Sequence, residues 1–218
     1  MILKRLEVGN LSVNCYIVGD EAVGEAAVFD PGGDVETILR VLSEHELRVR
    51  YILNTHSHFD HVGGNQALKI ATGAPILIHR DEGPWLQKAD ERAALFGFSA
   101  EKSKADRYLE EGDSLRVGSI RFDVMELRGH SYVGLGYLFE GDMNPGEDSG
   151  HRKILICGDI LFSGSIGRTD FPGGNLEVLL ENIRTKIFTL PDDTLILPGH
   201  GPMTTVGRER RFNPFVRD

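Results

Sequence analysis

The sequence has no long apolar run, only two cysteines and no surplus of basic residues. No segment approaches the roughly 20 apolar residues that cross a bilayer. Lys4, Arg5 and Glu7 interrupt the first residues, so we expect neither a membrane span nor a signal peptide. Cys15 and Cys157 each lie inside an apolar run, which predicts buried free thiols and a cytoplasmic protein. The net charge of −9 disfavours a nucleic-acid partner, whose phosphates require a basic protein face.

Short strand-like and helix-like segments alternate along the chain. Short apolar segments bounded by Gly or Asn predict strands, and apolar side chains repeating every three or four residues predict helices. Asp34 is the expected N-cap of the first helix, and Gly73 is expected to end the second. The predicted strands are 3–8, 14–19, 25–30, 50–54, 75–79, a hairpin at 114–127, 135–141, 153–159 and a strand and turn at 194–202; the predicted helices are 35–47, 65–73, short pieces within 81–107, and 175–190. This order predicts an α/β sandwich of two sheets in one domain, residues 1–218.

Histidine and aspartate gather where predicted strands end. The run NTHSHFDHVGG directly follows the strand at 50–54, and the other candidates each follow a strand beside a glycine. Loops at strand ends carry function on rigid scaffolds, and glycine allows the sharp turn. Imidazole suits zinc and iron, and a carboxylate can bridge two such metals. The pattern predicts two metals but does not decide which histidine binds which metal. The candidate ligands are His56, His58, Asp60, His61, His130, Asp159 and His200.

The remaining histidines are predicted to be structural. His45 lies near a helix end, His79 ends a strand, and His151 belongs to a polar loop at 142–153. If the strands on either side of this loop pair as a hairpin, His130 and Asp159 lie together at its open end. The loop then lies about 15–20 Å away, so we expect it to face solvent and to bind no metal.

Four motifs in order make the chain resemble the metallo-β-lactamase superfamily: THSHFDH, GH at 129–130, GDILF at 158–162 and PGHGP at 198–202. Within it, GSIGRTDFPGGN and ERRFNPF resemble the short single-domain hydrolases similar to hydroxyacylglutathione hydrolase (glyoxalase II). The resemblance implies an αββα sandwich of two mixed β-sheets flanked by helices, with the metals at one edge. It also implies a metal-dependent hydrolase of a small thioester of the S-(2-hydroxyacyl)glutathione type.

The resemblance further implies roles for the seven candidates and the metals. Two divalent metals are implied, zinc in the first place, with iron or manganese as alternatives. A hydroxide held between them would attack the substrate carbonyl; Asp60 would orient it and Asp159 would share it between the metals. The implied ligands are His56, His58 and His130 for the first metal, and Asp60, His61 and His200 for the second, with Asp159 bridging.

Three departures and one further residue qualify this resemblance. Tyr132 and Val133 stand where the family often has Pro-Gly after its third ligand. The loop at 142–153 is longer than usual. The sequence ends shortly after His200, so we expect no C-terminal helical domain like that of glyoxalase II. Arg168 lies where glyoxalase II places a lysine against the thiol carrier. It is expected either to hold a substrate carboxylate or to pair internally with Asp170.

Other activities of the superfamily remain as alternatives. Persulfide dioxygenases share the GRTDF stretch and would use a single iron, held here by His56, His130 and Asp159. A lactonase or a β-lactamase is less favoured, and no export signal is visible for a β-lactamase. The negative charge disfavours a nuclease.

Overall fold

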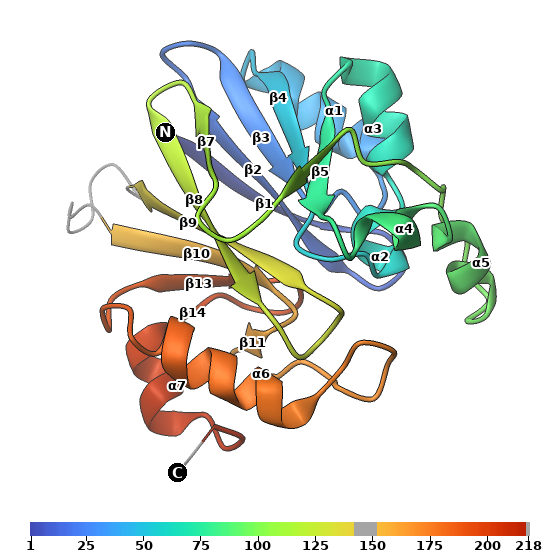
Figure 1. The fold of residues 1–218 in the computed structure, drawn as a ribbon. Coiled ribbons are helices and arrows are strands. Elements are labelled where there is room, and N and C mark those ends of the chain that lie inside the picture. The colour runs from blue at the N-terminus through green and yellow to red at the C-terminus, as the bar shows by residue number, and fades with distance from the viewer. Residues whose placement is uncertain (142–151, 217–218) are drawn as a thin grey trace. The chain divides into compact units, whose positions relative to one another are not determined.

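The computed structural model describes residues 1–141 and 152–216, which form two compact units. The first unit comprises Met1–Leu109 with Arg116–Ile120, and the second comprises Glu110–Leu115 with Arg121–Asp218. Each unit has one six-stranded mixed sheet with helices against it (Figure 1). The expectation of one domain over residues 1–218 stays a prediction, since two compact units can belong to one domain.

The sheet of the first unit has its strands in sequence order. It contains β1 (Ile2–Val8), β2 (Val13–Asp20), β3 (Glu25–Phe29), β4 (Arg48–Leu53), β5 (Ile76–His79) and β6 (Arg107–Leu109). The first three strands pair antiparallel, and β3 to β6 pair parallel. All eight residues of β2 are buried, as expected for a strand in the interior of a covered sheet.

Helices of the first unit connect the parallel strands and cover the sheet. They are α1 (Val35–Glu44), α2 (Phe59–Val62), α3 (Asn65–Thr72), α4 (Gly83–Leu86) and α5 (Ala89–Ala94). Figure 1 shows α1 and α3 beside these strands. Ile38 and Leu42 of α1 and Leu68 of α3 join the core that Ile52 and Ile76 build from the sheet. Right after β4, the short α2 carries part of the HxHxDH run.

The second unit repeats the pattern with more antiparallel pairing. Its sheet has the order β14, β13, β10, β9, β8, β7, where the strands are β7 (Ser114–Val117), β8 (Ile120–Leu127), β9 (Gly134–Gly141), β10 (Arg152–Gly158), β13 (Leu195–Pro198) and β14 (Thr204–Thr205). β10 and β13 pair parallel, whereas β8 with β9, β9 with β10 and β13 with β14 pair antiparallel. A two-stranded ribbon, β11 (Leu161–Phe162) and β12 (Ser165–Ile166), follows β10. The helices are α6 (Leu176–Asn182), a π-helical turn (Ile183–Ile187) and α7 (Val206–Phe212), and Leu179 and Ile183 pack on Leu155 and Ile196.

The structure confirms most of the predicted elements and corrects one cap. Gly73 adopts φ 71° and its N–H bonds the carbonyl of Lys69, so it ends α3 as predicted. Asp34 occupies the N-cap position of α1 as predicted, but it has φ 48° and does not cap the helix with its side chain. Its carboxylate instead accepts the N–H of Gly9 at 2.8 Å, because the left-handed backbone turns the side chain toward the β1–β2 turn.

The antiparallel pairing of β9 with β10 is confirmed, with Arg152 opposite Gly141. Most of the loop predicted to face solvent, residues 142–151, lies outside the described residues. None of the described helices has the length and apolar character that a membrane span requires.

Both cysteines are buried free thiols, as predicted. Burial raises the pKa of Cys157 to about 12. Burial, with the nearby Asp30 carboxylate, also raises the pKa of Cys15. Neither thiol is therefore a thiolate nucleophile at neutral pH, and both act as core side chains.

Candidate functional site

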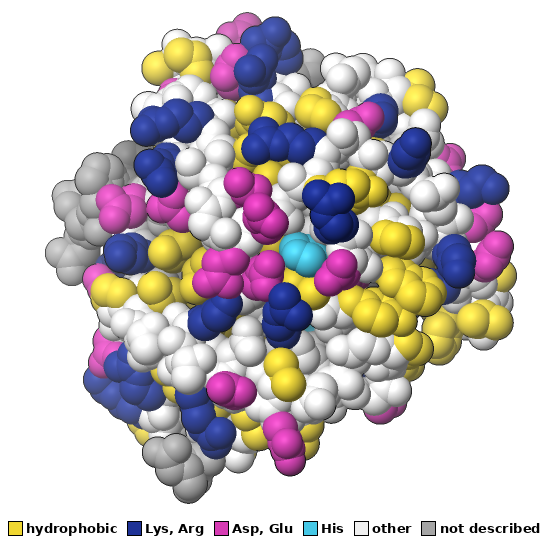
Figure 2. All heavy atoms as spheres, in the orientation of Figure 1, with side chains coloured by type: hydrophobic (Ala, Val, Ile, Leu, Met, Phe, Trp, Pro, Cys, Tyr) yellow, Lys and Arg dark blue, Asp and Glu magenta, His cyan; other side chains and the backbone are white. Residues whose placement is uncertain are grey.

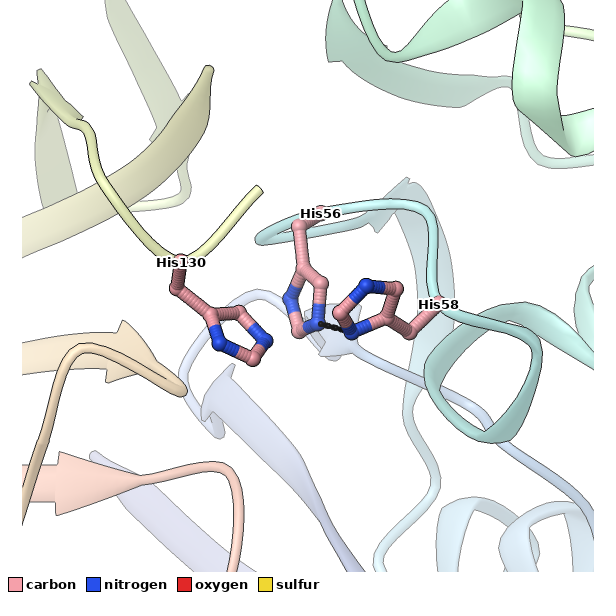
Figure 3. A group of neighbouring side chains, drawn as sticks. All are labelled: His56, His58 and His130. Carbon is pink, nitrogen blue, oxygen red and sulfur yellow. Dashed lines mark hydrogen bonds between the residues drawn. The ribbon is translucent and has the colours of Figure 1, made fainter. Parts of the chain in front are cut away.

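The HxHxDH run leaves the end of β4 as a fully buried loop. Thr55, His56 and Ser57 are at most 2% exposed, His58 is 8% exposed, and His61 is fully buried in α2. The ring centroids of His56 and His58 are 4.6 Å apart, and those of His56 and His61 are 4.1 Å apart. Figure 3 shows His56 Nε2 directed at His58 Nδ1, over a distance of 3.0 Å. Three imidazoles are thus held together inside one unit.

Asp30, at the end of the neighbouring strand β3, holds this loop in place. It is 1% exposed and adopts φ 48°. Its Oδ1 accepts the N–H of Thr55 at 2.7 Å, and its Oδ2 accepts the Thr55 hydroxyl at 2.6 Å. Oδ2 also lies 3.0 Å from His61 Nδ1. One buried carboxylate therefore orients both ends of the run.

These contacts fix which nitrogen of each ring carries hydrogen. The Thr55 hydroxyl gives its only hydrogen to Asp30, so at 3.0 Å it must accept from His56 Nδ1. His61 likewise donates from Nδ1 to the Asp30 carboxylate. The Nε2 atoms of His56 and His61 are then left with lone pairs, the form in which imidazole binds a metal. Asp60 Oδ2 lies 3.7 Å from His61 Nε2, the ring nitrogen that is left with a lone pair.

Three further candidates meet in the second unit. Asp159 follows β10, and its Oδ2 lies 3.7 Å from both His130 Nε2 and His200 Nε2. His130 is 2% exposed, whereas the side chain of His200 is 29% exposed. The parallel pairing of β10 with β13 explains why Asp159 and His200 lie close together. Gly199 donates its N–H to the carbonyl of Gly158 at 2.9 Å, which holds the two strand ends together.

The loop of His130, drawn in Figure 3 after β8, depends on glycine. Gly129 has φ 111°, and a Cβ there would lie 2.3 Å from the Leu179 nitrogen of α6. The Gly129 carbonyl accepts the N–H of Asn175, the residue that caps α6. Tyr132, which replaces the proline that the resemblance would predict, lies close to Gly173, where a Cβ would lie 2.6 Å from the Tyr132 nitrogen.

The GRTDF loop sets the orientation of the His130 ring. His130 Nδ1 lies 2.8 Å from the carbonyl oxygen of Arg168, which can only accept, so Nδ1 carries the hydrogen. Nε2, the atom facing Asp159, is therefore left with its lone pair. His130 thus has the same tautomer as His56 and His61. Its hydrogen-bond partner, the Arg168 carbonyl, belongs to the second unit, as His130 does.

The Arg168 side chain makes the internal pair that was one of its two predicted roles. Its Nε and one terminal nitrogen bond both oxygens of Asp170 at 2.8 Å, and its guanidinium lies 3.7 Å from the centre of the Phe171 ring. The hydrogen bonds from Arg168 lower the pKa of Asp170 to about 2. Both side chains are more than half exposed, so a substrate could still reach the guanidinium.

The donor set fits borderline divalent metals. Two nitrogens bound to one tetrahedral zinc are roughly 3.3 Å apart, because each Zn–N bond is about 2.0–2.1 Å. The 3.0 Å between His56 Nε2 and His58 Nδ1 and the 3.7 Å from Asp159 to its two histidines are close to this spacing. Both units therefore carry histidine and carboxylate side chains that could bind metal.

A groove of about 510 Å³ lies beside α2 in the first unit. The β1–β2 turn at Gly9–Leu11, the start of α1 and the segment 98–101 line it, together with Phe59 and Asp60. Phe59 stacks between Phe96 and Phe98, with 5.9 Å between ring centres in each pair. Figure 2 shows apolar side chains gathered beside α2 and α5. The volume lies within the range of small-molecule sites.

Two of the remaining histidines have the predicted structural settings. His45 caps the C-terminus of α1, and His79 is 7% exposed with its Nδ1 accepting the N–H of Asp81. His151 lies outside the described residues.

Sequence reasoning missed three buried residues that support the loops. Besides Asp30, these are Glu82, which bonds Ser57, and Glu209. Glu209, 1% exposed, accepts from Gly164 N at 2.8 Å and from the Thr204 hydroxyl at 2.6 Å, so the ERRFNPF stretch ties α7 to the β11–β12 ribbon. The only available signal for Asp30 was its place at a strand end before Pro-Gly-Gly.

The Metallo-beta-lactamase superfamily model matches residues 8–200 of this chain. The chain belongs to the metallo-β-lactamase superfamily. Among curated relatives, it is 35% identical over 219 residues to hydroxyacylglutathione hydrolase GloC of Haemophilus influenzae, covering 99% of this chain and 98% of that protein.

Solved structures of this superfamily share the fold over nearly the whole chain. The chain is 34% identical to BLEG-1, a B3 metallo-β-lactamase, with a TM-score of 0.87 and all of both chains covered. It is 34% identical to TTHA1623 in a di-iron-bound form, with a TM-score of 0.81, and the match covers 97% of this chain and 99% of that chain. It is 30% identical to ETHE1 from Myxococcus xanthus, with a TM-score of 0.78, and the match covers 98% of this chain and 84% of that chain. The predicted fold class, two mixed sheets flanked by helices, is confirmed.

Proposed function

We propose that this protein is a dinuclear metallohydrolase that cleaves thioesters of the S-(2-hydroxyacyl)glutathione type. The similarity to a hydroxyacylglutathione hydrolase carries the proposal, because it covers 98% of that relative and so concerns an enzyme of this length. The orienting partners of His56, His61 and His130 support it, since imidazoles with committed Nδ1 hydrogens suit metal binding.

The proposed ligands are divided between the two units. The first metal would be held by His56, His58 and His130, the second by Asp60, His61 and His200, and Asp159 would be shared. Zinc fits this donor set, and iron is an alternative because TTHA1623, a similar protein, holds two irons. Manganese, which carboxylate ligands suit, is a second alternative.

When bound, the metals would supply Lewis acidity and a nucleophilic hydroxide at neutral pH. The residues of the chain orient the histidine rings and would orient the attacking water. Asp30 and the Arg168 carbonyl hold three rings in the tautomer that presents Nε2. Asp60 would accept a proton or hydrogen bond from the attacking water, and Asp159 would keep the two metals at one spacing. Neither buried cysteine takes part.

The groove beside α2 is where we place part of the substrate. Its carboxylates, Asp34, Glu36 and Glu101, suit the ammonium group of a glutathione-like carrier better than a polyanionic carrier such as coenzyme A. Two buried thiols support a cytoplasmic location, where they stay reduced. We expect no nucleic acid or membrane as partner.

The alternative is a persulfide dioxygenase with one iron. The similarity to ETHE1 and the GRTDF stretch favour it. Such an enzyme would need only His56, His130 and Asp159 as ligands and would consume oxygen.

Paired assays on the purified full-length protein separate these activities. Protein loaded with zinc, or with iron under exclusion of air, is given S-lactoylglutathione, glutathione persulfide with an oxygen electrode, and a chromogenic β-lactam. We expect thioester hydrolysis and no oxygen uptake. Oxygen uptake without hydrolysis would replace the proposal by the dioxygenase, and β-lactam turnover alone would place the protein with enzymes such as BLEG-1.

Arg168→Ala tests whether this guanidinium binds substrate. If it does, we expect KM for S-lactoylglutathione to rise about tenfold with little change in kcat, the result of lost uniform binding. Because the pKa of Asp170 is about 2, the pair is ionised at every pH above about 4, so the KM effect should be constant from pH 5 to 8.

Asp170→Ala is the matched control for this substitution. It removes the internal partner and leaves the guanidinium available. Equal losses of kcat and thermal stability in both variants, with KM unaltered, would show that the pair only braces the loop.

A further inference from the structure

Glu82 is a buried carboxylate that contacts the middle of the HxHxDH run. It is fully buried directly after β5, at the start of α4. Its Oε2 accepts the backbone N–H of Ser57 at 3.1 Å and also the Ser57 hydroxyl. Ser57, itself 1% exposed, separates His56 from His58.

The position of Glu82 would ordinarily lead to a different use of its carboxylate. It occupies the N-cap of α4, where an acidic side chain usually accepts an N–H of its own helix. Here the side chain makes no such cap bond and reaches the loop 25 residues earlier in the chain. The helix therefore forms without this carboxylate, whose hydrogen bonds go to the histidine loop instead.

Burying a carboxylate is unfavourable unless hydrogen bonds or opposite charges compensate for it. A neutral glutamine could accept the same backbone N–H with a smaller desolvation cost. A negative charge at this place is favourable when a cation lies nearby in a medium of low dielectric constant. A metal held by His56 and His58 would supply that cation.

We propose that Glu82 is a positioning residue for the metal site, acting through Ser57 on the two histidines beside it. Asp30 fixes the run at Thr55 and His61, and Glu82 fixes it between them. The two carboxylates come from different strand ends, so the backbone that carries His56 and His58 is held at Thr55 and at Ser57. This inference rests on the metal binding of the proposed function and not on its thioester substrate.

The test compares full-length Glu82→Gln, Ser57→Ala, the double variant and Asp81→Asn. Asp81 is exposed and adjacent, so its amide substitution is the same chemical change without contact to the loop. Metal-free protein is titrated with Co²⁺ against a competing chelator, and the visible spectrum of bound Co²⁺ and the Tm of the metal-free form are recorded. The spectrum reports ligand geometry, which a purely structural role would leave unchanged.

We expect Glu82→Gln to weaken Co²⁺ binding 10- to 100-fold and to alter the spectrum, as for other outer partners of metal ligands. Ser57→Ala should weaken binding severalfold, and the double variant should be little worse than Glu82→Gln, because the two residues act together. Asp81→Asn should match the wild type.

Wild-type affinity and spectrum in Glu82→Gln would overturn the proposal, even if its Tm fell. If that variant does not fold, the same unchanged pair of readings in Ser57→Ala would overturn it. A wild type that binds no Co²⁺ would overturn it as well. A wild type that binds Co²⁺ but hydrolyses no thioester would refute the proposed substrate and leave the role of Glu82 intact.

Discussion

Replacing Asp159 by alanine should lower thioester turnover by well over 100-fold and reduce the bound metal per chain. The carboxylate lies 3.7 Å from two histidines that come from different loops, the position that a ligand shared by two metals would need. Losing an outer partner of a metal ligand typically costs 10- to 100-fold, and a shared ligand should cost more. Turnover of S-lactoylglutathione and metal analysis after gel filtration measure both effects.

Asp193→Ala is the matched control, since Asp193 is an exposed carboxylate in the same unit, two residues before β13. It should keep wild-type turnover and metal content. Near-normal turnover in Asp159→Ala, with full metal content, would rule out the shared-ligand role.

The second large effect is expected from Asp30→Ala. This substitution leaves the Thr55 N–H and hydroxyl and His61 Nδ1 without their buried acceptor, at about 1–3 kcal/mol for each unsatisfied group. We expect a clearly lower Tm of the metal-free protein. We also expect metal affinity to fall by at least 10- to 100-fold, because His56 and His61 lose their fixed tautomers.

Asp30→Asn separates these two consequences. The amide keeps one oxygen as an acceptor for Thr55 but gives a competing donor near His61, so stability should recover more than metal affinity. If Asp30→Asn binds metal as tightly as the wild type, the tautomer of His61 is not what Asp30 controls.

The metal-ligand candidates could be found from the sequence because each obeys a local rule. His56, His130 and His200 all follow an apolar run and lie beside or near glycine. The HxHxDH run places four side chains of types that can bind metal within six residues, a density that an ordinary polar turn does not require. The strands themselves were predictable for the same reason, since short apolar runs and turn residues are local features.

The residues that orient the ligands could not be found this way. Asp30 acts on Thr55 and His61, Glu82 on Ser57, and Glu209 on Gly164, over separations of 25 to 45 residues. Such pairings depend on which strand ends become neighbours in a sheet, and no local pattern encodes that. Asp34 shows the same limit: the local pattern predicted its N-cap position, but its left-handed backbone directs the carboxylate to Gly9 and not to its own helix.

Our account requires that two metals bind to the seven residues together. A crystal structure of the metal-replete protein, with the metals located by anomalous scattering, would show whether they do. We predict two ions about 3.5–4 Å apart, one bound by His56, His58 and His130, the other by Asp60, His61 and His200, and both by Asp159. A single fully occupied ion on His56, His130 and Asp159, with Asp60 and His61 turned away, would contradict the claim and favour the dioxygenase.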